Sequence, residues 1–140
     1  MTLKFSETLR NDRAEQIKAK IDADTNPGTL QFYTGPQPAT GAAITTETLL
    51  GTLTFSKPCG TVSAGVLTFD TVTEDSQADA SGTAVWVRIS DGAGNFVLDG
   101  DVGDLSSSAA FKMNTVEIVQ DGPIRIEQTL VPFTITEGNA

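Results

Sequence analysis

The feature that most constrains the fold is the absence of helical periodicity after about residue 25. From there on, apolar residues recur at every second position in short runs, and Gly, Pro, Asn or Asp separates the runs. Residues 83–90 form the strongest run, and a Gly-rich turn at 91–95 leads into residues 96–102. Consecutive strands without helices between them pair antiparallel, so the pattern predicts an all-β body.

The first part of the chain follows a different pattern, which predicts a helix over residues 6–21. Ser6 is a suitable N-cap, and no Gly or Pro occurs from there to Ile21. Leu9, Arg13, Ile17 and Ile21 lie on one helical stripe, and a segment containing Asn-Pro-Gly follows. Because the apolar stripe is narrow, we expect the helix to pack on another surface, either the body of the domain or a partner, rather than to be stable alone.

Together, the nine candidate runs predict about eight strands in a single domain, residues 1–140. The helix is expected at 6–21 and the β body at 29–140. Residues 35–43, 70–81 and 103–109 are predicted to be loops. The fold class is therefore mostly β, an antiparallel β-sandwich or jelly roll with one N-terminal α-helix. The expected strands span residues 30–34, 49–56, 66–72, 83–90, 96–102, 111–113, 116–119, 124–128 and 130–136.

The charge distribution bears on partners. The net charge of −9 argues against nucleic acid, which requires clustered Lys and Arg. No apolar run is long enough to cross a membrane, and no secretory leader is expected. Residues 1–21 nevertheless carry a net charge of +2, from five basic and three acidic residues. A solvated helix face is the simpler interpretation; the alternative is a docking surface for an acidic neighbour, formed by Arg10, Arg13, Lys18 and Lys20.

Few residues are suited to catalysis or cofactor binding, and we expect no enzyme, metal or cofactor. The chain has no histidine, which excludes Ser-His-Asp and Cys-His arrangements. Its single cysteine, Cys59, lies in a Pro-Cys-Gly turn and is interpreted as a loop residue. Asp99, Asp101 and Asp104 resemble the start of a calcium loop but lack the rest of its ligand series. We interpret them, and the acidic run from Asp70 to Asp79, as solvated carboxylates.

The single tryptophan, Trp86, occupies the middle of the strongest predicted strand. It alternates with Ala84 and Arg88, and burial in the core is the favoured interpretation. The alternative is a stacking platform, with Trp86 or Tyr33 binding carbohydrate.

Several segments together show a resemblance to a family of small structural proteins encoded among the virion genes of tailed bacteriophages. The similar pattern extends over most of the chain and consists of turn and strand residues rather than a catalytic motif. It is carried by residues 3–13, 30–38, 80–84, 114–118, the series Gly122, Ile124 and Ile126, and residues 133–140.

This resemblance implies a capsid decoration, or cement, protein that stabilises the shell by binding between capsid subunits. Its partners would be the phage major capsid protein and further copies of itself, as a dimer or trimer, in a virion assembled in the host cytoplasm. The loop containing Pro36 and Pro38 would suit an extended strap laid across a neighbour. The alternatives are a head–tail or tail-associated structural protein and, from another class, a carbohydrate-binding adhesin-like module.

Overall fold

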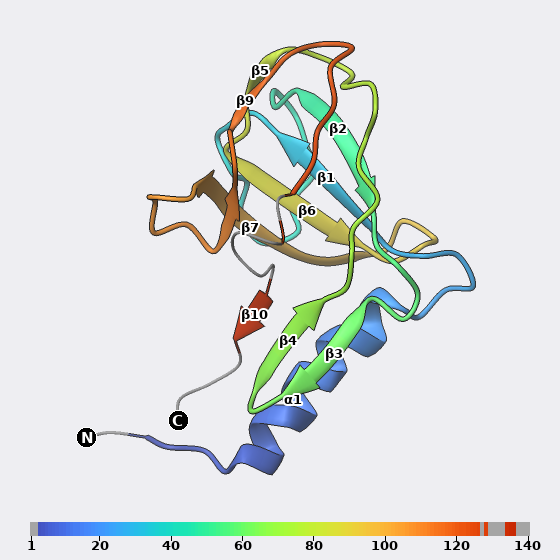
Figure 1. The fold of residues 1–140 in the computed structure, drawn as a ribbon, viewed down its shortest axis with the longest axis vertical. Helices are drawn as coiled ribbons and strands as arrows, with labels where there is room; N and C mark the ends of the chain where they lie inside the picture. Colours follow the sequence, from blue (N-terminus) through green and yellow to red (C-terminus); the bar gives the residue numbers. More distant parts are fainter. Residues whose placement is uncertain (1–2, 127, 129–133, 137–140) are drawn as a thin grey trace.

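The computed structural model describes residues 3–126, 128 and 134–136, and in this part of the chain it contains one helix and ten strands (Figure 1). The mostly β fold with an N-terminal helix is confirmed. The elements are α1 (Glu7–Ile21), β1 (Thr29–Tyr33), β2 (Leu49–Thr54), β3 (Gly60–Ser63), β4 (Val66–Phe69), β5 (Gly82–Thr83), β6 (Trp86–Ser90), β7 (Phe96–Asp104), β8 (Phe111–Met113), β9 (Glu117–Ile118) and β10 (Thr134–Thr136).

A curled five-stranded sheet, in the order β2-β1-β6-β7-β8, forms the main layer. Its pairs are antiparallel except for β7 with β8, which run parallel. On the inner face, Leu30 lies opposite Ile89 and Phe32 lies opposite Val87, and all four side chains are fully buried. Successive residues of a strand point to opposite faces, so Thr29, Gln31 and Tyr33 lie on the outer face.

α1 and the sheet β10-β4-β3 pack together at one end of the five-stranded sheet, where α1 also contacts β7, and apolar side chains of both parts join one core cluster (Figure 1). The β3–β4 hairpin turns at Ala64 and Gly65, both with positive φ. Two helix side chains hold this turn: Asn11 accepts the Gly65 N–H at 2.7 Å, and Arg10 donates to the Ala64 carbonyl at 3.1 Å. Leu67 and Phe69 of β4 then meet the helix residues Ala14 and Ile21 in the core.

Residues 70–81 form a mostly exposed loop, as predicted, but the fold holds this loop at several points. Thr73 and Asp75 form isolated β-bridges with Thr54 and Ile124, and Ala78 is buried. The Asp75 carboxylate also accepts the Thr52 N–H at 2.9 Å. The segment therefore connects β2 to the chain near Ile124, and a carboxylate that seemed solvated caps an edge strand.

Other differences from the predicted elements have local causes. β3 was missed because Thr61, Val62 and Ser63 contain one apolar residue, too few to define a period. Of the strand predicted at 124–128, residue 127 lies outside the described part, and the described residues contain an isolated bridge at Ile124, whose neighbour Pro123 has no N–H to donate. Of the strand predicted at 130–136, residues 130–133 lie outside the described part, and Thr134–Thr136 is β10. Among the described residues, no helix combines the length and apolar character needed to cross a bilayer.

The buried stripe of α1 also differs from the predicted one. Ala14 and Ile21 are fully buried and Ile17 packs against the core, as a helix docked on the body requires. Leu9 is 43 % exposed, because the first turns present Arg10 and Asn11 to the β3–β4 turn instead. The docked face of the helix is thus rotated away from Leu9.

Shortening Ile21 should therefore destabilise the fold much more than shortening Leu9. We expect Ile21→Ala to lower the free energy of unfolding by about 2–5 kcal/mol, because it leaves a cavity in the core. Leu9→Ala, the matched control on the same helix, should change it by less than about 0.5 kcal/mol. Urea titration followed by circular dichroism measures both, and equal losses would contradict this packing of α1.

Candidate functional site

The pairing of β1 with β6 places Trp86 and Tyr33 on the outer face of the five-stranded sheet, the face opposite the main core cluster. They are paired in the β1–β6 register, and their rings stack with centroids 4.6 Å apart and planes inclined by 14°. The Trp86 indole N–H donates to the Thr34 carbonyl at 2.9 Å. Trp86 is fully buried and Tyr33 is 5 % exposed, yet neither belongs to the core cluster. The predicted burial of Trp86 is confirmed, and the ring packs with Tyr33 apart from the main core cluster.

Arg88 extends this arrangement along β6. Its guanidinium makes two hydrogen bonds to the Asp99 carboxylate, at 2.8 and 2.9 Å, and lies between the rings of Trp86 and Phe96, 5.3 and 5.2 Å from their centroids. The hydrogen bonds that Arg88 donates to the Asp99 carboxylate raise the pKa of its guanidinium. Burial raises the pKa of the Tyr33 hydroxyl. We call Tyr33, Trp86, Arg88, Phe96 and Asp99 the outer-face cluster.

The cover of this cluster is the loop that connects β1 to β2. The Nη2 atom of Arg88 donates a hydrogen bond to the Ala42 carbonyl at 2.9 Å. A side-chain carbon added at Gly41 would come within 3.1 Å of the Phe96 ring, so the loop backbone lies directly on that ring. The segment predicted to reach across a neighbour therefore lies on its own sheet, with Pro36 exposed and Pro38 half-buried. With both rings covered, Trp86 and Tyr33 present no stacking platform for carbohydrate in this conformation.

The four predicted basic partner-binding residues of α1 have separate roles. Arg10 is bonded to the Ala64 carbonyl, and Arg13 lies over the Phe5 ring at 5.1 Å. Lys18 is half-buried and Lys20 is exposed. α1 packs on β3 and β4, whereas the loop that contains Pro36 and Pro38 lies on the outer face of the five-stranded sheet. The structure therefore does not bring the basic residues of α1 together with these two prolines.

The three aspartates of β7 do not converge on a common point. Asp99 is bound to Arg88, Asp101 accepts the Ala110 N–H at 2.7 Å, and Asp104 accepts the Ser106 N–H and hydroxyl at 3.0 and 2.7 Å. The Ser106 hydroxyl and N–H lower the pKa of Asp104. Across residues 3–126, 128 and 134–136, no group of three or more acidic, Cys or His side chains is placed to hold a metal.

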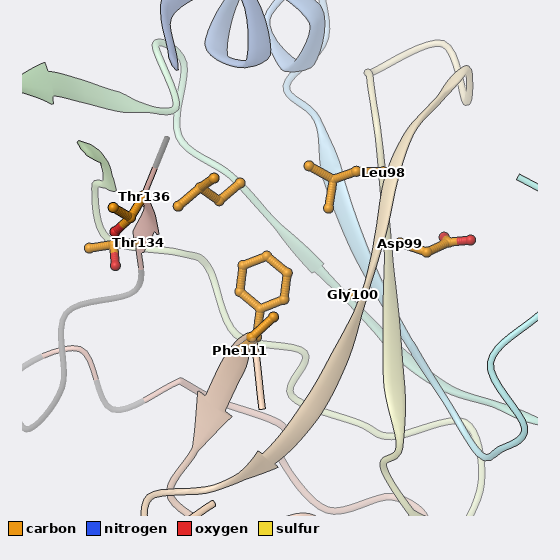
Figure 2. A pocket seen from close by; sticks show the side chains of 8 residues that line it. Leu98, Asp99, Gly100, Phe111, Thr134 and Thr136 are labelled. Carbon is orange, nitrogen blue, oxygen red and sulfur yellow. The ribbon is translucent and has the colours of Figure 1, made fainter. Parts of the chain in front are cut away.

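A hollow of about 450 Å³ lies between β7, β8 and β10 (Figure 2). Leu98 and Phe111 point into it, while Asp99 points away toward the outer face. Ala110, Thr134 and Ile135 complete much of the wall, so the described lining is apolar with hydroxyls at one side. Such a hollow can take an apolar group, but the described lining directs no charged side chain into it.

Cys59 is fully buried, and its N–H donates to the Asp22 carboxylate at 3.1 Å. Burial, reinforced by the negative charge of Asp22, raises the pKa of its thiol to about 12.

Comparison with known proteins finds no match: no protein family, curated protein or solved structure matches this chain.

Cys59 should be inert in the folded protein. At pH 8 a thiol with a pKa of about 12 is ionised to about one part in 10,000, and burial keeps reagents away from it. We expect no reaction with an aromatic disulfide reagent over an hour in buffer, and one thiol per chain after unfolding in guanidinium. Labelling of the folded protein within seconds would contradict the buried placement.

Proposed function

We propose that this chain is a structural protein of a tailed-bacteriophage virion, and specifically a decoration protein that binds between capsid subunits. The resemblance over most of the sequence supports the class of protein. The observation that carries the specific role is the position of α1. The helix docks by one face on β3 and β4, and its exposed Leu9 and Lys20 are available to a partner on a chain of net charge −9.

A docked helix with an exposed, mixed apolar and basic surface suits an acidic, partly apolar neighbour. Apolar contact supplies most of the affinity in such interfaces, and complementary charge sets orientation and the rate of encounter. On a shell, each copy needs only a weak contact, because many contacts act together on one particle. The proposed partners are the major capsid protein and, between adjacent sites, further copies of this chain as a dimer or trimer.

Binding to particles that lack the protein tests this proposal. We expect purified protein to saturate the particles and to raise the temperature at which they release their contents. Lys20→Glu should weaken binding about three- to tenfold at low ionic strength, and added salt should narrow that difference. Arg125→Glu is the matched control: it reverses an exposed charge outside α1, on a residue 3.5 Å from Glu74.

Three results would contradict the proposal or a part of it. Failure of the folded protein to associate with such particles would remove the decoration role. Binding confined to the neck or tail, located by imaging labelled protein on the particle, would replace it with the head–tail or tail-associated role. Equal effects of Lys20→Glu and Arg125→Glu would remove α1 as the contacting surface.

A further inference from the structure

The loop that covers the outer-face cluster is closed at its base. Residues 35–47, which we call the covering loop, leave the sheet at Thr34 and return at Thr48. The Thr34 N–H donates to the Thr48 carbonyl at 3.1 Å, and the Thr48 N–H donates to the Thr34 hydroxyl at 2.9 Å. A compact loop whose two ends are joined in this way is an Ω-loop, and it can move as a unit about its base.

Above its base, the covering loop meets the sheet at three places. Gly35 lies against Val85, the Ala42 carbonyl accepts from Arg88, and Gly41 lies on Phe96. Within the described part of the chain, the bond from Arg88 is the hydrogen bond that joins this loop to the sheet beyond its base. Most residues of the loop are exposed. Segments with few buried contacts open at a much lower free-energy cost than the whole domain unfolds.

The covered surface is unusual for the outer face of a sheet. It holds the chain's single tryptophan and single tyrosine, stacked and almost inaccessible to solvent although they do not belong to the main core cluster. The loop contacts Val85 just before Trp86, Arg88 just after it and Phe96 on the neighbouring strand, and the Trp86 indole donates to Thr34 at the base of the loop. Opening the loop would therefore uncover two aromatic rings without disturbing the core.

The partner that fits the uncovered surface can be inferred from what covers it now. The covering loop carries a single charged residue, Glu47, and the outer-face cluster pairs Arg88 with Asp99. The contact is thus nearly neutral, although each chain carries a net charge of −9. A second copy of the chain can supply the same loop in the same geometry, as in domain swapping, without bringing like charges together at the contact.

We propose that the covering loop is a hinged flap, and that opening it exposes the Tyr33–Trp86 surface as a docking site for the covering loop of a second copy. The assignment of the partner rests on the proposed function, because a shell places copies next to one another. The flap itself depends only on the contacts of the loop. Experiments on the isolated protein and on particles can therefore fail independently.

Two glycines with positive φ allow a matched test of the flap. Gly41 has φ +67°, and an added side-chain carbon would press on Phe96; Gly94, in the β6–β7 turn, has φ +88° and nothing within 4 Å of the added carbon. An alanine strains the backbone at both positions, but only at Gly41 must the loop and the Phe96 ring also move apart by a few tenths of an ångström. Trp86, the single tryptophan, reports the effect through quenching of its fluorescence by acrylamide.

We expect Gly41→Ala to raise the quenching constant of Trp86 about threefold or more, with far-UV circular dichroism unchanged, and Gly94→Ala to leave the constant at the wild-type value. An unchanged constant in Gly41→Ala would overturn the flap. An equal rise in both variants would do the same, because it would reflect general loosening of the fold.

A synthetic peptide of residues 35–47 tests the partner, with a scrambled peptide of the same composition as its control. The native peptide should restore the protection of Trp86 in Gly41→Ala, and the scrambled peptide should not. In sedimentation, Gly41→Ala without peptide should form dimers at lower concentration than Gly94→Ala. No restoration together with a monomer at millimolar concentration would overturn loop exchange, whatever the particle-binding experiment gives.

Discussion

The pairing of β1 with β6 is the interaction on which the rest of the structure depends. In this register Leu30 and Phe32 meet Ile89 and Val87 on one face, while Tyr33 meets Trp86 on the other. A shift of one residue would exchange the two faces and place aromatic and charged groups in the core. The same register therefore determines where α1 docks and what the covering loop covers.

The two faces are stabilised by different means. On the inner face, burial of apolar side chains against α1 and β4 supplies the driving force. On the outer face, burial removes water from the charged groups of Arg88 and Asp99, which costs free energy. The two hydrogen bonds between these side chains, together with the contacts of Arg88 with the flanking rings, offset much of that cost. Such a pair adds little net stability, but it is sensitive to geometry. Its contribution is to hold β6 and β7 in register and to provide the donor that holds Ala42.

Much of the fold could be predicted from the sequence, because α1 and the longer strands have clear periods. The arrangement of side chains on the outer face of the five-stranded sheet was harder to predict. Trp86 and Arg88 are two residues apart and so share a face, which is a signal that Trp86 packs beside a charged residue and apart from the main core cluster. What hides Trp86 could not be predicted, because the covering loop has no period and is placed by contacts with Val85, Arg88 and Phe96. Similarly, Asp75 looks solvated until Thr52 and Ile124 are brought to it by the fold.

The order in which the strands pair has a consequence for how the chain folds. Phe32 of β1 pairs with Val87, 55 residues later, and Thr68 of β4 pairs with Thr134, 66 residues later. Closing such long loops costs entropy before the apolar contacts can compensate, and domains dominated by distant pairings fold slowly. During synthesis β1 has only β2 as a partner until β6 emerges from the ribosome, so its other edge is open for that interval. A chain made in many copies at once is then most at risk of joining the wrong neighbour before its own sheet is complete.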